Sequence, residues 1–348
     1  MKVLMKGNEA IAEAAIRAGC TLYFGYPITP QSEIPEYMSR RLPTIPGGAY
    51  IQAETEVAAI NMGYGAACTG RRALTSSSSP GVSLMMEGMS YLAGAELPCV
   101  VVNIMRGGPG LGNINPEQAD YFQAVKGGGH GSYRLMVLAP SSVQEMADLT
   151  VLGFDLADKY RNPVMLVAEG NLGQMMEPVE FQESYPDAHD KSSWSLTGAK
   201  GRKGHTITSI YLDADEMEEY IHKLWGKYTE MERTEVRFEE YHTEDAEVVI
   251  VAYGIVSRVV RTVVESLRQE GIKAGLLRPI TLWPFPKDII RRHAEHAKFL
   301  LVCEMSMGQM VEDVMLSVGG ARPVYFYGRS GGNVPGPAEI AAEVRKHL

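Results

Sequence analysis

The chain contains few cysteines, and their spacing excludes several kinds of site. The four cysteines among 348 residues are Cys20, Cys68, Cys99 and Cys303. No two of them have the close spacing that is typical of zinc sites and iron–sulfur motifs. A disulfide framework is also untypical of a chain with this length and cysteine content. We therefore expect no metal ion and no iron–sulfur cluster bound by this chain alone.

Long apolar runs and concentrated positive charge are also missing. The N-terminal sequence MKVLMKGNEA has no apolar segment of the kind found in signal peptides. No charge-free apolar stretch of about 18 residues, the length that suggests a membrane span, occurs in the chain. The formal net charge is -9, and no run of lysine or arginine indicates a phosphate-binding face. We expect a cytoplasmic protein that binds neither nucleic acid nor membrane.

Short β-rich runs alternate with amphipathic helical stretches over the first half of the chain. Strands are predicted at 22–25, 49–52, 72–75, 99–105, 135–138 and 163–168. Helices are predicted at 8–18, 32–40, 54–68, 81–93, 117–125 and 142–159. Strands that alternate with helices of this size form parallel sheets covered on both faces. The sequence therefore predicts a doubly wound α/β domain over residues 1–176.

The second half of the chain divides into two parts. Residues 177–245 are polar and rich in charge, which indicates a connecting segment with one or two surface helices. Beyond this segment, strands are predicted at 248–253, 274–278, 299–303 and 324–327, and a helix at 257–269. The sequence therefore predicts a second, smaller doubly wound α/β domain over residues 246–348.

Four loops of unusual composition follow predicted strands. They are Gly25–Pro30, Gln52–Glu56, Thr75–Gly81 and Asn103–Gly112. In open parallel sheets, ligands bind at the carboxyl ends of the strands. We therefore expect these loops to converge on one edge of the first sheet and to form the functional site there.

Glu56 lies near the start of a predicted helix whose next residues are small and apolar. A carboxylate at this position can simply satisfy backbone N–H groups and the helix dipole. The small residues, however, allow a flat ligand or another surface to approach closely. A carboxyl group in such a dry setting can share a proton with a ring nitrogen of the ligand.

Arg106 follows an apolar strand and begins a glycine-rich loop. It is either a structural arginine that binds carbonyl groups or a fork for a substrate carboxylate. Residues 107–112 lack the Gly-x-Gly-x-x-Gly spacing and the acidic partner of a dinucleotide-binding loop. Thr29 has a simple alternative role as a cap of the next helix, and His130 in a glycine-rich stretch is more typical of a structural histidine.

Taken in order along the chain, these motifs resemble the α subunit or domain of 2-oxoacid:ferredoxin oxidoreductases. The similar segments are Tyr26–Pro30, Glu54–Ala66, Thr75–Gly81 with Leu84, Met85 and Glu87, the Arg106 loop, Leu282–Pro286 and Gly308–Met310. The segments that are most similar to the branched-chain, 2-oxoisovalerate type are Met5–Ala10, Gly107–Gly112 and Lys126–Gly131. The resemblance covers nearly the whole chain.

The resemblance implies a thiamine-diphosphate-binding domain of the pyrimidine type, followed by a transketolase C-terminal-like domain. It implies an enzyme that oxidatively decarboxylates a 2-oxoacid with coenzyme A, yields acyl-CoA and carbon dioxide, and reduces ferredoxin. The expected substrate is 2-oxoisovalerate, with pyruvate or 2-oxoglutarate as alternatives. Two other roles are a thiamine-dependent decarboxylase or transketolase-like enzyme without ferredoxin, and a non-catalytic assembly subunit.

The resemblance also implies roles for individual residues. The implied cofactor-binding residues are Pro27, Ile28 and Glu56, and the implied ligands of the 2-oxoacid or coenzyme A are Thr29 and Arg106. Glu56 would face the aminopyrimidine N1′ of thiamine diphosphate, and its distance from Gly65-Ala66 favours it over Glu54. The loop after Arg106 departs from the family pattern, because Leu111 stands where hydroxyl-bearing residues are common. This change would suit a branched aliphatic substrate.

The sequence contains no Gly-Asp-Gly, the motif with which thiamine-diphosphate enzymes bind the metal–diphosphate group. Together with the lack of cysteine clusters, this absence implies that magnesium and iron–sulfur clusters belong to partner subunits. We expect an obligate hetero-oligomer with β, γ and ferredoxin-like δ subunits, in which the thiamine diphosphate is shared with a partner.

Overall fold

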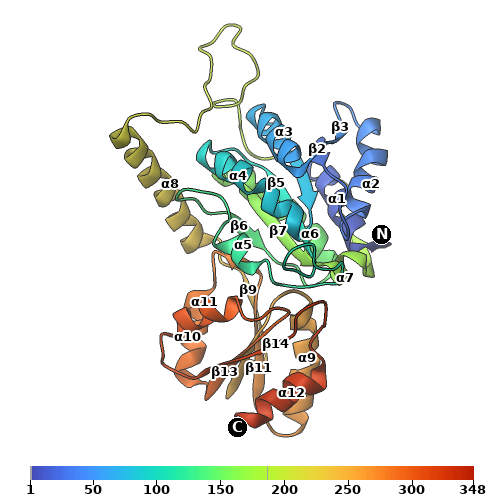
Figure 1. The fold of residues 1–348 in the computed structure, drawn as a ribbon, viewed down its shortest axis with the longest axis vertical. Coiled ribbons are helices and arrows are strands. Elements are labelled where there is room, and N and C mark those ends of the chain that lie inside the picture. The colour runs from blue at the N-terminus through green and yellow to red at the C-terminus, as the bar shows by residue number, and fades with distance from the viewer. Residues whose placement is uncertain (1, 186) are drawn as a thin grey trace.

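A seven-stranded sheet forms the centre of the larger of two α/β units in the computed structural model, which describes residues 2–185 and 187–348 (Figure 1). The strand order is β12-β6-β7-β5-β4-β2-β3. The strands are β2 (Leu22–Gly25), β3 (Ala49–Gln52), β4 (Ala73–Ser77), β5 (Val100–Met105), β6 (Met136–Leu138), β7 (Val164–Glu169) and β12 (Thr281–Trp283). All neighbouring pairs are parallel except β12 with β6.

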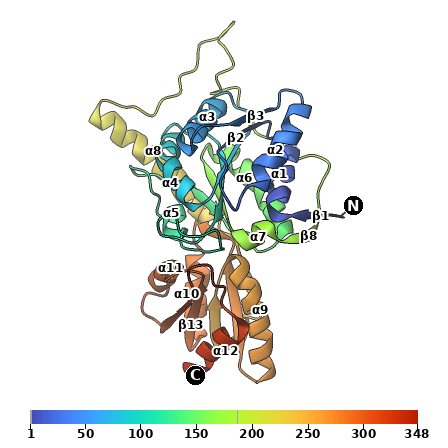
Figure 2. The ribbon, with the colours of Figure 1, turned by 45° about the vertical axis from the view of Figure 1, so that its right-hand side comes forward.

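Helices cover both faces of this sheet. One group consists of α1 (Gly7–Arg17), α2 (Glu33–Arg41) and α6 (Val143–Tyr160), in which α1 packs against both α2 and α6; a short 3₁₀ helix, Leu42–Thr44, follows α2. The other face carries α3 (Glu56–Cys68) and α4 (Ser79–Gly94), which also pack together (Figure 2). Because helices cover both faces, β5 and β7 are buried along their whole length, as their apolar sequences require.

The smaller unit is built on a five-stranded sheet with the order β14-β13-β10-β11-β9. Its strands are β9 (Phe238–Tyr241), β10 (Val248–Val251), β11 (Ala274–Pro279), β13 (Phe299–Glu304) and β14 (Val324–Gly328). The helices α9 (Gly254–Gln269) and α12 (Pro337–Lys346) pack together on one face, and α10 (Lys287–His296) and α11 (Met310–Val318) on the other. Helix α9 buries Val256, Val260 and Val263 at helical spacing, which fixes the face that it turns to the sheet.

The predicted elements of both units agree closely with the structure. The bounds of the six predicted strands of the first unit differ from the observed bounds by at most two residues. The main discrepancy is the predicted helix at 117–125, which is wrong over its first turn because α5 spans only Tyr121–Val125. Glu117 and Gln118 instead extend toward the second unit, where Gln118 forms hydrogen bonds with Met305.

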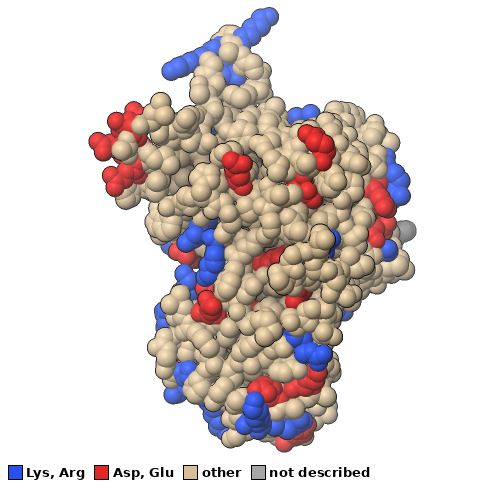
Figure 3. All heavy atoms as spheres, viewed as in Figure 1, with Lys and Arg blue, Asp and Glu red and all other residues tan. Residues whose placement is uncertain are grey.

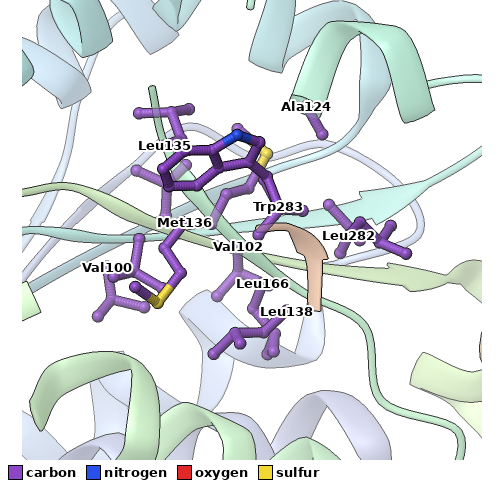
Figure 4. Close-up of a cluster of buried hydrophobic side chains, with 14 of the residues drawn as sticks. Val100, Val102, Ala124, Leu135, Met136, Leu138, Leu166, Leu282 and Trp283 are labelled. Carbon is purple, nitrogen blue, oxygen red and sulfur yellow. The ribbon is translucent and has the colours of Figure 1, made fainter. Parts of the chain in front are cut away.

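Two short strands cross the boundaries that the sequence suggests. Strand β9 lies in the polar segment 177–245, which the sequence predicts to be only a connection between the two units. It pairs antiparallel with β11 and forms an edge of the smaller sheet. Strand β12 lies within the region assigned to the second unit but pairs with β6 of the first sheet. Figure 4 shows Leu282 and Trp283 of β12 packed among the core residues Met136 and Leu138. The two units are therefore interlocked.

The remaining elements lie at the surface of the larger unit. Strands β1 (Lys2–Lys6) and β8 (Met176–Glu180) form a two-stranded antiparallel sheet, and α7 (Gly170–Gln174) precedes β8. The long helix α8 (Ala214–Thr234) is the expected surface helix of the polar segment, and it buries only Leu224, Tyr228 and Met231. None of the helices in the described part of the chain is long and apolar enough to cross a membrane.

Candidate functional site

The four loops identified in the sequence meet at the carboxyl ends of β2, β3, β4 and β5, as predicted. Four hydrogen bonds join them in pairs: Ala53 N–H to Gly25 O (2.9 Å), Ser77 Oγ to Glu56 Oε1 (3.3 Å), Arg106 N–H to Ser79 Oγ (3.0 Å) and Arg106 Nη1 to Thr29 O (2.9 Å). Segments that are up to about 80 residues apart in sequence thus form one continuous edge. We call this edge, formed by residues 25–30, 52–56, 75–81 and 103–112, the loop edge.

Glu56 is the first residue of α3, and its side chain is only 4% exposed. Its carboxylate is not needed as a helix cap, because Thr55 is the N-cap and its hydroxyl accepts a hydrogen bond from Ala58 N–H at 3.1 Å. The carboxylate instead accepts a hydrogen bond from Ser77 Oγ. Glu54, the other glutamate of the motif, is exposed to solvent. The structure therefore singles out Glu56 as the buried carboxylate of the loop edge.

Glu56 packs closely against Gly81, and exposed apolar side chains lie on the neighbouring segments. A Cβ atom at Gly81 would overlap both the Glu56 carboxylate and the Ser77 hydroxyl, so only glycine allows this close approach. Large apolar side chains nearby in the fold are exposed: Tyr26 by 38%, Ile51 by 43%, Val57 by 41% and Leu84 by 52%. Exposed apolar groups beside a buried polar group are typical of a binding surface.

Arg106 is half-buried and binds two backbone carbonyl groups. Its Nη1 donates to Thr29 O, and its Nη2 donates to Leu111 O at 3.3 Å. The Nε atom is buried and has no hydrogen-bond partner among the described residues. The structural role is therefore present, and the guanidinium group still has unused N–H groups that can bind an anion.

The other residues implied by the resemblance lie on the loop that follows β2. Thr29 is exposed, and its carbonyl group contacts Arg106. Pro27 is exposed and Ile28 is half-buried. The structure thus brings Thr29 and Arg106 together and places Glu56 beside Ser77, in a separate contact of the same loop edge.

Two pockets border the chain segment that follows Arg106. One, of about 410 Å³, is lined by Thr29, Pro30, Ser32, Glu33, Ile114, Asn115, Pro116, Gly170, Asn171 and Gln174. The other, of about 810 Å³, lies between the loop edge and the smaller unit. It is lined by Ser79, Pro80, Ser83, residues 107–111, Glu117, Ala119, Asp120, Gln123, Met307, Gln309 and Ser330. The larger pocket is wide enough for a small organic ligand.

Two polar residues beside the larger pocket were not singled out from the sequence, although Asn103 begins the fourth of the loops. Asn103 is completely buried in β5, and its side chain binds Ser79 N–H at 3.0 Å and Asp120 at 2.9 Å. Asp120 also accepts a hydrogen bond from Ser79 Oγ at 2.6 Å. Burial is the main cause that raises the pKa of Asp120 above its ordinary value. The only available signal was Asn103, the single polar residue in an otherwise apolar strand.

The loop edge continues into the contact between the two units. Gln118 N–H donates to Met305 O at 2.7 Å, and Met305 N–H donates to Gln118 Oε1 at 3.0 Å. Gln118 Nε2 also donates to Glu169 at the end of β7, and Glu169 accepts a further bond from Ile255 N–H at 3.3 Å. Burial raises the pKa of the Glu169 carboxyl group to about 7.

Charge is unevenly distributed over the face shown in Figure 3. Basic side chains project from the loop above α3, acidic ones gather at the start of α8, and the outline narrows where the two units meet.

Among residues 2–185 and 187–348, no group of three or more His, Cys, Asp or Glu side chains could hold a metal ion.

The doubly wound sheet with four loops at the carboxyl ends of its strands is the arrangement predicted for a thiamine-diphosphate-binding domain. The chain belongs to the pyruvate flavodoxin/ferredoxin oxidoreductase family, whose thiamine-diphosphate-binding domain matches residues 13–253. Residues 246–340 match core domain II of pyruvate:ferredoxin oxidoreductase. The predicted fold class and family resemblance are thereby confirmed, and the chain is an oxidoreductase subunit of this family.

Several relatives extend this result over the whole chain. The chain is 54% identical to the ketoisovalerate oxidoreductase subunit VorB of Methanothermobacter marburgensis, over 99% of this chain and 97% of that protein. It is 36% identical to the 2-oxoglutarate synthase subunit KorA of Methanocaldococcus jannaschii, over 99% and 100% of the two chains.

Solved structures show the same architecture. The 2-oxoglutarate:ferredoxin oxidoreductase from Magnetococcus marinus, determined with 2-oxoglutarate, coenzyme A and succinyl-CoA bound, superposes with a TM-score of 0.89 at 28% identity. The match covers 99% of this chain and 65% of that one, so this chain corresponds to part of the longer polypeptide. A split-gene transketolase, an inactive β4 tetramer, has a TM-score of 0.61 at 13% identity and shares the fold alone.

Proposed function

We propose that this chain is the α subunit of a complex that oxidatively decarboxylates 2-oxoisovalerate with coenzyme A and reduces ferredoxin. The observation that carries the proposal is Glu56, a buried carboxylate that Thr55 releases from helix capping and that packs directly against Gly81, where no other residue type would fit. The substrate assignment is supported by the relative that is named a ketoisovalerate oxidoreductase subunit.

Each proposed residue has a task that its surroundings permit. When bound, thiamine diphosphate supplies the electron sink for decarboxylation. Glu56 holds a proton at N1′ of the aminopyrimidine ring, and Ser77 orients the Glu56 carboxylate through its hydrogen bond. Pro27 and Ile28 contribute the adjoining wall of the cofactor site, on the loop after β2.

Substrate binding is assigned to the other end of the loop edge. The unused N–H groups of Arg106 bind the carboxylate of the 2-oxoacid or a phosphate of coenzyme A, with Thr29 beside them. Leu111 is 85% exposed, and we assign it to the contact with a branched aliphatic side chain. An apolar side chain here removes the hydroxyl groups that a more polar 2-oxoacid would bind.

The partner subunits complete the site in this proposal. The sequence has no Gly-Asp-Gly motif, so a β subunit binds the magnesium ion and the diphosphate group. The electron path through iron–sulfur clusters belongs to a ferredoxin-like δ subunit and to ferredoxin, and a γ subunit completes the complex. The proposed division of the chain is 1–176, 177–245 and 246–348. Strand β9 of the middle segment joins the smaller sheet, and strand β12 of the last segment joins the larger sheet.

The test uses the complex purified after co-expression of this chain with its neighbouring subunit genes. Reduction of ferredoxin is measured with 2-oxoisovalerate, pyruvate and 2-oxoglutarate in the wild type, in Glu56→Gln and in the matched control Glu54→Gln. We expect 2-oxoisovalerate to have the highest kcat/KM, and Glu56→Gln to lower kcat by at least about 100-fold, while Glu54→Gln stays near wild type.

Three outcomes would contradict all or part of the proposal. Full activity of Glu56→Gln in an assembled complex would remove Glu56 from the cofactor site. Absence of 2-oxoacid-dependent electron transfer in a wild-type complex that contains thiamine diphosphate would favour the alternative role as a non-catalytic assembly subunit. A higher kcat/KM with pyruvate or 2-oxoglutarate would contradict the substrate assignment but not the proposed oxidative decarboxylation.

A further inference from the structure

Asp120, Asn103 and Ser79 form a closed hydrogen-bonded triangle beside the larger pocket. Ser79 Oγ donates to Asp120 Oδ2 at 2.6 Å, and Asn103 Nδ2 donates to the same oxygen at 2.9 Å. The third side of the triangle is the bond from Ser79 N–H to Asn103 Oδ1 at 3.0 Å. Residues from three separate elements therefore fix both the backbone and the side chain of Ser79.

Ser79 occupies an unfavourable backbone conformation. Its φ is 20°, a positive value that side-chain-bearing residues rarely adopt. Such a conformation persists only where the surrounding contacts hold it, and it is frequent at functional sites. Asn103 is completely buried and Ser79 is 7% exposed, so water does not compete freely for these hydrogen bonds.

Ser79 lies between the two proposed binding groups. On one side, its hydroxyl oxygen accepts the hydrogen bond from Arg106 N–H and thereby locates the start of the arginine loop. On the other side, Ser79 begins α4, and Gly81 in the same turn is the residue that lies against Glu56. The position of Ser79 therefore sets the separation between Arg106 and Glu56.

We propose that Asp120 is a positioning residue of the oxidoreductase: with Asn103, it holds Ser79 so that Arg106 and Glu56 keep the separation that a bound 2-oxoacid and cofactor require. This proposal rests on the proposed function of the site. Asp120 acts through Ser79, and Asn103 provides the buried support from β5. The effect is on substrate placement, since a misplacement of about 1 Å can cost about 100-fold in rate.

The test compares Asp120→Ala and Asp120→Asn in the purified complex. Asp120→Ala removes the shared acceptor, and we expect KM for the 2-oxoacid to rise by about 10-fold, with a smaller fall in kcat. Asp120→Asn keeps an oxygen that can accept both hydrogen bonds, so we expect KM to return to within about 3-fold of wild type. The matched control is Asp148→Ala in α6, which removes a carboxylate that also has a raised pKa because of burial and is bonded to Gln144.

A second variant tests the same idea if Asp120→Ala does not assemble. Ser79→Gly relieves the positive φ but removes the hydroxyl group that binds Arg106 N–H and Asp120. We expect Ser79→Gly to raise KM for the 2-oxoacid by about 10-fold even where the melting temperature is unchanged or higher.

Three results would overturn the proposal. One is a lower melting temperature of Asp120→Ala with unchanged KM, which indicates a purely structural role. Another is an Asp120→Asn variant as impaired as Asp120→Ala, which means that the hydrogen bonds are not what matters. The third is unchanged KM in Ser79→Gly. The kinetics of each variant are compared with those of an active wild-type complex. A wild-type complex that is inactive with every 2-oxoacid would overturn the proposed function and this proposal together.

Discussion

The two sheets end their parallel strands toward each other, but they use those ends differently. In the larger unit, the ends of β2, β3 and β4 lead into loops that leave Glu56 beside exposed apolar side chains. In the smaller unit, the ends of β10 and β13 lead into Tyr253–Ile255 and Met305, whose backbone groups bind Gln118 and Glu169. The backbone groups directly after β10 and β13 are thus used in contacts within the chain, and the larger pocket begins only beyond them, at Met307 and Gln309.

This difference shows that strand topology alone does not determine a ligand site. Both units are doubly wound, and in both the carboxyl ends of the strands are the expected binding position. A site remains only where the loops leave polar groups without internal partners and apolar groups without cover. Four changes to the chain test this difference between the two units.

The largest effect is expected from Gly81→Ala, at the strand ends of the larger unit. The added methyl group overlaps the Glu56 carboxylate and the Ser77 hydroxyl, so the carboxylate has to move. We expect kcat of the complex to fall by about 100-fold, and the overlap with two buried side chains to lower the free energy of unfolding by about 1–3 kcal/mol as well. Gly65→Ala on α3 is the control, because no atom lies within 4 Å of its added Cβ. Equal activity of the two variants would refute the packing of Gly81 against Glu56.

The second change, Gly254→Ala, disrupts the contacts at the strand ends of the smaller unit. Gly254 has a φ of 55°, and an added Cβ would overlap the buried Glu169 carboxyl group. We expect a loss of about 3 kcal/mol in the free energy of unfolding, measured by denaturant titration of the complex. Gly271→Ala, with a φ of 84° and no atom near its added Cβ, separates backbone strain from overlap and is expected to cost about 1 kcal/mol. A similar loss in both variants would mean that strain alone matters.

The third change concerns pH and Glu169. Burial raises its pKa to about 7, so the folded protein holds a proton that the unfolded chain releases near pH 4.5. The stabilisation is complete below about pH 4.5 and is lost as pH rises through about 7. Burial also raises the pKa values of Glu304 and Asp120 nearby, and the same direction applies to them. Between pH 5 and 7.5, the melting temperature of Glu169→Gln should fall less steeply with rising pH than that of the wild type. Parallel curves would show that Glu169 does not contribute to the pH dependence of stability.

The smallest effect is expected from Leu111→Ser. Leu111 is 85% exposed in the chain alone, and its loss removes one apolar contact with a branched substrate. We expect kcat/KM with 2-oxoisovalerate to fall by about 5-fold and that with pyruvate to change less, since one apolar contact contributes about 1 kcal/mol. The ratio of the two kcat/KM values is the measurement. An unchanged ratio would remove Leu111 from substrate selection.

Much of the fold was predictable from local patterns. Alternating apolar runs and amphipathic helices located the strands of the first sheet, and the four polar loops after them indicated the loop edge. Glu56 was recognisable because small residues follow it. The sequence did not show that Thr55 provides the helix cap, which is the observation that separates the two interpretations of Glu56.

The features that were not predictable depend on contacts distant in sequence. The strand β9 reads as polar because it is a half-exposed edge, and β12 has only three residues, which is too short for a periodic pattern. Asp120 and Gln118 lie in a segment that resembles a helix start. Asp120 binds Ser79 and Gln118 binds Met305, and only the packing of the whole chain brings these pairs together.

The exchanged strands constrain how this protein can be divided. The chain enters the smaller sheet at β9, returns to the larger sheet for β12, and then goes back for β13. A cut between the two units would remove β12 from β6 and leave an unpaired strand edge, a common cause of aggregation. Gene fusion and gene splitting in such enzymes should therefore preserve the stretch from β9 to β13 as one piece.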